Sequence, residues 1–318
     1  ARSAGEAKVM NIQNAIKIAI VGCGRIAGKH FEAIAAHSDH LELVAVCDSD
    51  RETVERVAAE RAVPGFRSMR EMLEALKIDL VALCTPSGLH PEEAVLAASY
   101  GVHVMTEKPM ALTLEDADAM IRACDEAQVK LFVVKQNRFN RPVVKLREAL
   151  ESGRFGKLVM GTIRVRWCRP QSYYDQDAWR GTWALDGGVL ANQASHHVDL
   201  LEWMMGEVES VVAMTRRALV DIEAEDTAAV LLRFTCGALG IIEATTATRP
   251  KDLEGSISIL GEKGSVEIGG FAVNEMKVWN FTEPTPDDEE VRDHYSVNPP
   301  NVYGFGHLSF YEHAVRAL

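Results

Sequence analysis

Apolar runs and amphipathic stretches alternate along the first 136 residues. The run from Ile16 to Val21 is apolar except for Lys17 and ends at Gly22, and an amphipathic stretch follows from Arg25 to His37. This order predicts a buried strand, a tight turn and a helix. The same rhythm then predicts strands at Leu41–Cys47, Leu80–Cys84, His103–Met105 and Leu131–Val134, and helices at Arg51–Arg61, Pro91–Tyr100 and Leu114–Ala127. Strands that alternate with helices indicate a doubly wound α/β domain with a parallel sheet.

After about Gln136 the pattern changes. A helix over Pro142–Glu151 is followed by long segments that alternate apolar and polar residues, interrupted by one helix over His197–Met205. The predicted strands are Leu158–Cys168, Val208–Arg216, Thr227–Phe234, Ala238–Ala247, Gly255–Leu260 and Ser265–Ile268. Glycine turns between such strands indicate an α+β domain with an open, mostly antiparallel sheet. We therefore expect one domain over residues 1–136 and a second over residues 137–318.

Two segments outside these elements carry smaller expectations. Residues before about Met10 are expected to extend from the folded part of the chain. The acidic, proline-containing run from Glu283 to Glu290 is typical of a solvated loop.

Length, composition and charge narrow the class of protein. A chain of 318 residues is longer than one ordinary core needs, and 47% hydrophobic with 25% charged residues is usual for a globular protein. The net charge of −12 argues against nucleic acid or an anionic membrane as partner. The six cysteines are scattered without metal-ligand spacing, so no metal site is indicated. No secretory signal or membrane-spanning run is visible, and we expect a cytoplasmic protein.

A glycine motif opens the first predicted helix. Gly22, Gly24, Arg25 and Ile26 belong to a GxGxxA pattern directly after a strand, where glycine allows a pyrophosphate to approach the backbone. By itself this pattern also fits an ordinary tight turn. Asp48 ends the second strand 24 positions after Gly24, close to the spacing expected of a carboxylate that binds ribose hydroxyls. This carboxylate favours NAD over NADP, although a helix cap is the alternative role for Asp48.

Two further motifs follow strands of the same predicted sheet. Thr85–His90 follows one strand and Thr106–Pro109 follows the next, so both lie at the edge where doubly wound sheets bind ligands. Together with the glycine motif and Asn192–Asp199, they resemble the glucose-fructose oxidoreductase and inositol dehydrogenase family (Gfo/Idh/MocA) over nearly the whole chain. The resemblance implies a Rossmann domain with NAD as cofactor. The residues expected to contact NAD are Gly22, Gly24, Arg25, Ile26, Asp48, Ser49, Arg51, Thr85, Pro86, His90, Glu107, Lys108 and Gln136.

The resemblance also assigns two catalytic residues, Lys108 and His196. Oxidation of a secondary alcohol needs a base for the hydroxyl proton, for which His196 is suited, and a nearby cation or relay, for which Lys108 is suited. His197 is the competing base. Without the resemblance, this histidine and this lysine would be interpreted as ordinary structural groups.

The position four residues before this histidine departs from the family pattern. The family commonly has an acid there, whereas this chain has Asn192, and an amide cannot raise the basicity of His196 as a carboxylate would. Asn192 could still bind a substrate hydroxyl. Asp186 and Asp199 are weaker candidates for a supporting acid.

A closer resemblance concerns the segment from Arg164 to Arg180. Its arginines, aromatics and amides are similar to those of the bacterial WlbA-type UDP-N-acetyl-glucosaminuronic acid 3-dehydrogenases. Those enzymes oxidise the C3 hydroxyl with NAD+ and supply a pyridoxal-phosphate aminotransferase in lipopolysaccharide biosynthesis. A diphosphate and a carboxylate suit arginine forks. The residues expected to bind the nucleotide sugar are Lys108, Arg138, Arg166, Gln171, Tyr173, Arg180, Asn192 and His196.

Other interpretations of this segment and of the chain remain open. The arginines could be solvated, and core positions are favoured for Trp167 and Trp183. The substrate could be a free sugar or inositol, NAD could be recycled during cleavage of a glycosidic bond, or the chain could be a silent NAD sensor. The family resemblance further implies a homotetramer, or a homodimer, formed through the open sheet, and a C-terminal helix that returns to the cleft.

Overall fold

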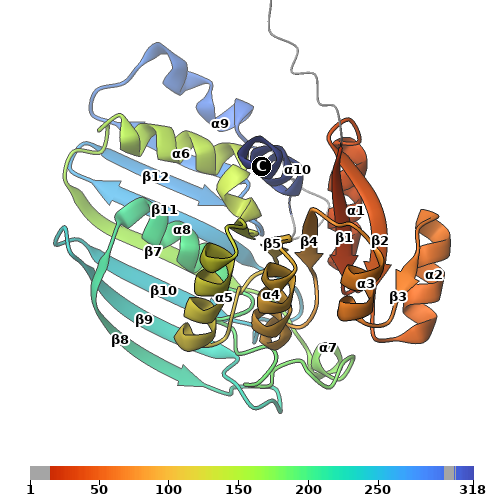
Figure 1. Cartoon of the computed structure of the whole chain (residues 1–318). Coiled ribbons are helices and arrows are strands. Elements are labelled where there is room, and N and C mark those ends of the chain that lie inside the picture. Colours follow the sequence, from red (N-terminus) through yellow and green to blue (C-terminus); the bar gives the residue numbers. More distant parts are fainter. Residues whose placement is uncertain (1–14, 297–303, 305) are drawn as a thin grey trace, which may run out of the picture.

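The computed structural model of the chain describes residues 15–296, 304 and 306–318. It contains a six-stranded sheet and a seven-stranded sheet, each with its own helices (Figure 1). The expected extension before Met10 lies outside the described residues. None of the helices in the described ranges is both long and apolar enough to cross a membrane.

The first sheet is wholly parallel, with the strand order β3-β2-β1-β4-β5-β6, which confirms the predicted Rossmann domain. Its strands are β1 (Ile16–Val21), β2 (Leu41–Cys47), β3 (Gly65–Phe66), β4 (Leu80–Leu83), β5 (His103–Thr106) and β6 (Leu131–Val133). Helices α1 (Ala27–Ala36), α2 (Arg51–Arg61), α3 (Met69–Ala75), α4 (His90–Ser99) and α5 (Leu114–Glu126) accompany them. The central strands are buried on both faces, which explains their continuous apolar runs. The pattern missed β3 and α3 because each is very short.

The second sheet has the strand order β13-β12-β11-β7-β10-β9-β8. Its strands are β7 (Leu158–Arg166), β8 (Val208–Arg216), β9 (Thr227–Phe234), β10 (Leu239–Thr245), β11 (Glu254–Gly261), β12 (Gly264–Gly269) and β13 (Glu275–Phe281). Only β7 and β10 pair in parallel, so the sheet is mostly antiparallel as predicted, although β13 was not expected.

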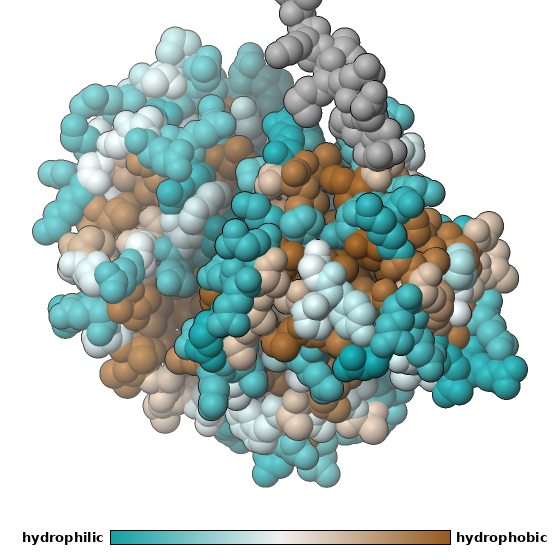
Figure 2. All heavy atoms as spheres, viewed as in Figure 1, coloured by the Kyte–Doolittle hydropathy of each residue, from teal (hydrophilic) through white to brown (hydrophobic). Residues whose placement is uncertain are grey.

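Two helices cover one face of this sheet, α6 (Arg141–Glu151) and α8 (Ser195–Met205), and they form its core with it (Figure 1). The opposite face has no covering layer among the described elements. Strand β8 is exposed along its whole length. Figure 2 shows hydrophobic side chains at the surface at the lower left, where β8 and β9 run.

The last helix, α10 (Gly306–Ala317), returns to the first domain. Phe310, Tyr311 and Ala314 are buried in the core cluster that also contains residues of β1 and α1. The expected helix is therefore present. It packs beside α1 (Figure 1), and its His307 contacts Glu107, which lines the cleft described below. The chain thus crosses twice between the two halves.

One local expectation was confirmed with a single exception, and another was wrong. The run from Glu283 to Glu290 is exposed as expected except at Asp288, whose side chain is 12% exposed and accepts hydrogen bonds from Arg154 and from the indole of Trp279. Trp183 was expected in the core, but 62% of it is exposed. Its segment, residues 182–187, forms a turn in which the N–H groups of Asp186 and Gly187 donate to the main-chain oxygen of Thr182. Trp167 is buried as expected.

Candidate active site

A cleft of about 770 Å³ lies between the two domains. The first domain contributes residues that follow each of its six strands, and the second contributes residues from the end of β7 to the first turn of α8. This is the carboxyl edge of the parallel sheet, as the sequence predicted. The cleft therefore joins the glycine motif to the motif that contains His196.

The glycine loop has the shape that a dinucleotide requires. Gly22 has a φ of +88°, and a Cβ there would lie 2.7 Å from the backbone of Cys84, so only glycine fits. At Gly24 a Cβ would meet nothing within 4 Å, which leaves open space beside the backbone. No side chain caps the start of α1, and the positive end of the helix dipole at this terminus favours an anion. These features fit a bound pyrophosphate.

Asp48 lies at the end of β2 and lines the cleft. Its carboxylate accepts hydrogen bonds from the backbone N–H of Cys23 at 2.7 Å and of Asp50 at 2.9 Å, so it is fixed against the glycine loop. The cap of α2 is Asp50 instead, whose side chain accepts from Thr53. The position of Asp48 is the one expected for a ribose ligand.

Lys108 points from the end of β5 toward the second domain. Its Nζ donates to the main-chain oxygen of Asn192 at 3.1 Å and to the side-chain Oδ1 of the same residue at 3.2 Å. Burial lowers the pKa of Lys108, while the charges of Glu107 and Asp186 oppose that effect. A lysine in this setting carries a proton that it can share with a substrate hydroxyl.

His196 is buried at the cleft and lies in the first turn of α8. Burial and the nearby cations Lys108 and Lys135 hold its pKa well below the usual value. Its Nε2 lies 3.0 Å from Nε2 of Gln136, while Nδ1 has no partner among the described residues. The Gln136 amide therefore holds Nε2 of His196, while Nδ1 is buried.

His197, the competing base, does not line the cleft. It is fully buried with its ring edge-on to Trp167, and burial lowers its pKa to about 4. Neither ring nitrogen has a partner in the described structure. The geometry therefore places His196, and not His197, next to Lys108.

Glu107 is the centre of a buried hydrogen-bond network behind Lys108. His30 donates to it at 3.0 Å and His307 at 3.4 Å, while Tyr311 lies 2.7 Å from the other nitrogen of His30. Burial opposes ionisation of Glu107, but these two hydrogen bonds outweigh it and hold its pKa well below the usual value. The ligand atoms of His30, Glu107 and His307 lie within 4.8 Å of one another, and hydrogen bonding accounts for this arrangement.

Aromatic rings and guanidinium groups alternate along one wall of the cleft. Arg169 lies 5.3 Å from the ring centre of Trp167 and 5.4 Å from that of Tyr173. Arg180 lies 4.7 Å from the ring of Tyr173 and 4.5 Å from that of Trp179. All five residues line the cleft. We refer to them as the arginine ladder, which holds two cations in fixed orientations.

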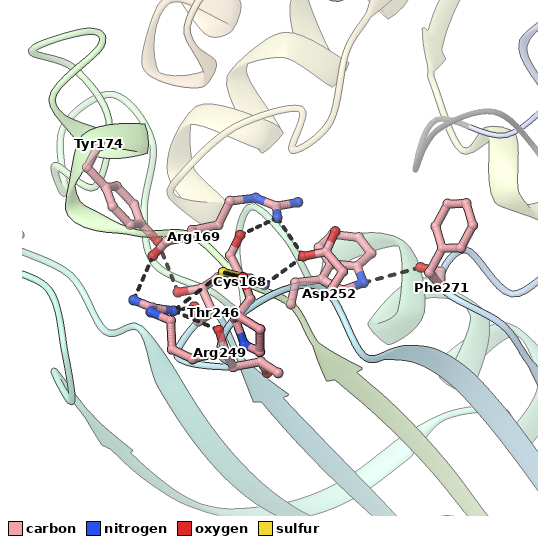
Figure 3. Close-up of polar contacts among 10 residues, drawn as sticks. Cys168, Arg169, Tyr174, Thr246, Arg249, Asp252 and Phe271 are labelled. Atoms are coloured by element: carbon pink, nitrogen blue, oxygen red, sulfur yellow. Dashed lines mark hydrogen bonds and ion pairs between the residues drawn. The ribbon is translucent and has the colours of Figure 1, made fainter.

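Polar contacts brace this ladder from behind. Arg169 donates to Asp252 at 2.9 Å and to the main-chain oxygen of Cys168 at 2.7 Å (Figure 3). The indole of Trp167 donates to the main-chain oxygen of Phe271. Arg180 donates to Asp177 at 2.9 Å. Each arginine keeps other N–H groups that can reach an anion in the cleft.

Most of the residues expected at the NAD site line this cleft together, the exception being Arg51, which pairs with Glu55 on the surface. Of the residues expected to bind substrate, five line the cleft: Lys108, Tyr173, Arg180, Asn192 and His196. Three do not. Arg138 pairs with Asp199, Arg166 pairs with Glu243 and Glu254, and Gln171 bonds Asp175 and the backbone of Asp221.

The structure adds cleft residues that were not among those expected to bind NAD or substrate, including Arg67, Arg169, Asp177, Trp179 and Gln193. Arg169 and Trp179 belong to the basic segment from Arg164 to Arg180. The composition of that segment indicated that it lines the cleft, but not which of its residues do so. Arg67 lies between the short β3 and α3 and donates to the main-chain oxygen of Ser49. No motif marked it.

A parallel sheet with a dinucleotide loop, and a lysine and a histidine facing the same cleft, define a dinucleotide-dependent oxidoreductase. Comparison with known proteins agrees. Residues 16–135 match the model of the oxidoreductase family with an NAD-binding Rossmann fold, and residues 143–267 match the GFO/IDH/MocA C-terminal domain. The chain belongs to this GFO/IDH/MocA family, and it is an NAD-dependent sugar dehydrogenase.

Individual relatives differ in what they oxidise. Myo-inositol 2-dehydrogenase of Thermotoga maritima is 32% identical over 79% of this chain and 74% of the relative. D-apiose dehydrogenase of Paraburkholderia graminis is 30% identical over 73% of this chain and 61% of the relative. Among solved structures, the WlbA dehydrogenase of Bordetella pertussis, in complex with NADH and UDP-GlcNAcA, is 48% identical with a TM-score of 0.92, covering 96% of this chain and 88% of that one.

Proposed function

We propose that this enzyme oxidises the C3 hydroxyl of a UDP-N-acetyl-glucosaminuronic acid-type nucleotide sugar to the 3-keto sugar. The observation that carries the proposal is the arginine ladder, which presents two oriented guanidinium groups in the cleft of a chain with a net charge of −12. An uncharged sugar or inositol needs no such cations, whereas a diphosphate and a carboxylate do. The 48% identity to the WlbA dehydrogenase of Bordetella pertussis supports the same substrate class.

The catalytic step needs a proton acceptor and a hydride acceptor. Bound NAD+ supplies the hydride acceptor for the hydrogen on C3. His196 accepts the hydroxyl proton, because its low pKa keeps it neutral and able to take a proton. Lys108 donates an N–H to the hydroxyl oxygen and stabilises the negative charge that develops there. The products are the 3-keto sugar, NADH and one proton.

The product suggests the class of reaction that follows. A ketone at C3 is a substrate for transamination, so we propose that a pyridoxal-phosphate aminotransferase consumes it in the formation of a diamino sugar. Such coupling would also draw an unfavourable oxidation forward.

The test is NADH absorbance on incubation with NAD+ and UDP-N-acetyl-glucosaminuronic acid, beside myo-inositol and free sugars. We expect NADH from the nucleotide sugar, and a coupled aminotransferase should increase the yield. Turnover of inositol or a free sugar with none of the nucleotide sugar would contradict the substrate proposal and favour the function of the 32% identical relative.

A second measurement tests the arginine ladder itself. Arg180→Gln should raise KM for the nucleotide sugar by about tenfold or more with a smaller change in kcat, since a charged hydrogen bond contributes about 1.5–3 kcal/mol. Arg122→Gln is the matched control, because Arg122 is exposed on α5 and does not line the cleft. Equal KM values for the two variants would show that the arginine ladder does not bind the substrate.

A further inference from the structure

Asp186 is a buried acid that the dehydrogenase chemistry described above does not use. Only 1% of it is exposed, although it lies at the wall of the cleft. It belongs to a tight turn in which the N–H groups of Asp186 and Gly187 both donate to the oxygen of Thr182. The turn is held to the first domain, because Gly88 donates to the main-chain oxygen of Leu185. Asp186 therefore has a fixed position close to the junction of the two domains.

Both carboxylate oxygens of Asp186 accept hydrogen bonds. One accepts from the backbone N–H of Gly181 at 2.7 Å, and the other accepts from the side-chain amide of Asn192. The same amide group accepts from Lys108 Nζ through its oxygen at 3.2 Å. A continuous chain of contacts thus runs from Gly181 through Asp186 and Asn192 to Lys108.

The order of donors along this chain fixes the orientation of the amide. A side-chain amide can rotate by half a turn, which exchanges its acceptor oxygen for its donor nitrogen. Toward Lys108 only the oxygen is acceptable, because the ammonium has donors and no acceptor. An ionised Asp186 has acceptors alone, so it holds the nitrogen of Asn192 and turns the oxygen to Lys108.

The charged groups around Lys108 show why Asp186 also matters electrostatically. Glu107 precedes Lys108, but two histidines already bind its carboxylate. Lys135, after β6, and His196, in α8, face Lys108 without adding negative charge. Asp186 is the other carboxylate that favours the ammonium form of Lys108. Burial raises the pKa of Asp186, whereas the hydrogen bonds from Gly181 and Asn192 favour its ionised form.

We infer that Asp186 is a positioning residue for the oxidation: it holds Asn192 so that its amide oxygen fixes Lys108 beside the reacting hydroxyl. The inference rests on the role proposed above for Lys108. Asp186 acts through Asn192 and touches neither substrate nor cofactor in this assignment. The buried acid therefore has a function in catalysis beyond its bond to Gly181.

The test exploits the donor order. In Asp186→Asn, the new side chain gives its oxygen to Gly181 and presents N–H groups to Asn192, which must then rotate and turn its own N–H groups toward Lys108. We expect kcat to fall by about tenfold or more with little change in KM, because a misplaced catalytic group can cost up to about a hundredfold. The alkaline limb of the kcat profile should move to lower pH, since loss of a negative charge lowers the pKa of Lys108.

A double variant restores the donor order. In Asp186→Asn with Asn192→Asp, the asparagine at 186 donates to a carboxylate at 192, which accepts directly from Lys108. We expect kcat and the alkaline limb to return to within about threefold and within about half a pH unit of the wild type, since a neighbouring carboxylate commonly shifts a pKa by one to three units. If Asp186 is only structural, the double variant will be as slow as the single one, and that result would overturn the inference.

Asp226→Asn is the matched control. Asp226 is also a fully buried carboxylate that accepts backbone N–H groups, those of Ala218 and Leu219, but it does not line the cleft. Its substitution should lower stability and leave the kcat profile in place. A shift of the alkaline limb equal to that of Asp186→Asn would show that loss of any buried acid has this effect, and would contradict the inference.

A readout without turnover separates this inference from the substrate proposal. The reactivity of Lys108 toward acetic anhydride, measured against pH by mass spectrometry, reports its pKa in the whole protein with NADH and no sugar. We expect the pKa of Lys108 to be lower in Asp186→Asn than in the wild type and to recover in the double variant, whatever sugar the enzyme oxidises. The double variant also serves if the single one does not fold, because a folded double variant with an unrecovered Lys108 pKa and low kcat would refute the inference.

Discussion

At the scale of single residues, burial moves the pKa values of both proposed catalytic groups downward. The pKa of His196 is lowered because the ring is buried and faces the cations Lys108 and Lys135. The pKa of Lys108 is lowered because burial disfavours its charged form. Both pKa values are lowered, but the two groups act in different protonation states. Neutral His196 is the form that accepts a proton, and protonated Lys108 is the form that stabilises the alkoxide.

These shifts predict the pH profile of the enzyme. Since His196 is protonated only below its lowered pKa, kcat should stay high as the pH falls through 6.5, and the acid limb should lie below that value. The alkaline limb, where Lys108 loses its proton, should lie below pH 10.5. Steady-state rates on the nucleotide sugar from pH 5 to 10.5 test both limbs.

A variant assigns the acid limb to its residue. His196→Asn should lower kcat by a hundredfold or more, within the roughly 10²–10⁴-fold range of general-base catalysis, and the remaining activity should lack the acid limb. His197→Asn should keep the limb, since His197 lies outside the cleft. An acid limb at or above pH 6.5, or its loss in His197→Asn, would contradict the assignment of His196.

At the scale of elements, an ion pair joins the connection after α6 to the segment after β13. Arg154 donates to both oxygens of Asp288, at 2.8 and 2.6 Å, and lies 4.0 Å from the ring centre of Phe281. The indole of Trp279 donates to the same carboxylate at 2.7 Å. Hydrogen bonds from Arg154 hold the pKa of Asp288 well below its usual value. The acidic run is therefore attached to the sheet.

Removing this pair should destabilise the fold without affecting catalysis. Arg154→Met leaves Asp288 largely buried without its cation, and we expect the free energy of unfolding to fall by about 1–3 kcal/mol. Because the folded-state pKa of Asp288 is depressed, its contribution is present at neutral pH and is lost as the pH falls below about 4. Denaturant unfolding at pH 7 and at low pH measures both effects.

The control is an exposed pair of the same charges. Arg316→Met removes the partner of Glu312 on the surface of α10, where both side chains are more than half exposed, and should change stability by less than about 0.5 kcal/mol. The prediction is contradicted if both variants lose a similar free energy of unfolding, or if the loss in Arg154→Met is the same at low pH as at pH 7. Either result would show that the buried pair of Arg154 contributes no more to stability than an exposed one.

At the scale of the whole molecule, the uncovered face of the second sheet is apolar in its β8–β9–β10 region. Leu231 pairs with Val212 on one side and with Ile241 on the other, and alternation places these side chains on the face opposite to α6 and α8. Leu231 is 59% exposed, Val212 68% and Met214 78%. A row of this kind is typical of an interface between copies of a chain. We therefore propose a homo-oligomer formed through this sheet.

A charge in this row should break the oligomer. Leu231→Arg places a cation at its centre, and we expect the mass measured by light scattering to fall toward that of one chain. Leu114→Arg is the control, because Leu114 is 86% exposed on α5 in the other domain, and its mass should not change. A wild-type protein that is monomeric at micromolar concentration would contradict the proposal.

The same face explains why one arginine was misplaced by sequence reasoning and another was missed. Arg166 and Arg169 are three residues apart in the same basic segment. Arg166 still belongs to β7 and, by alternation, its side chain lies on the uncovered face with Glu243 and Glu254. Arg169 follows the strand end and turns into the cleft. Composition identified the segment, but the point where β7 ends decided which arginine serves the site.

By itself the sequence determined the Rossmann half, most of the second sheet and the glycine loop with Asp48, whereas the roles of Lys108 and His196 came from the resemblance to a family. These features depend on local patterns, because strand ends, turns and helix starts follow from neighbours in the chain. The tertiary structure decided the rest. Asp186 reaches Lys108 only because a turn docks on Gly88, and α10 adds His307 and Tyr311 only by returning across the molecule. Such contacts join distant residues, and no local pattern records them.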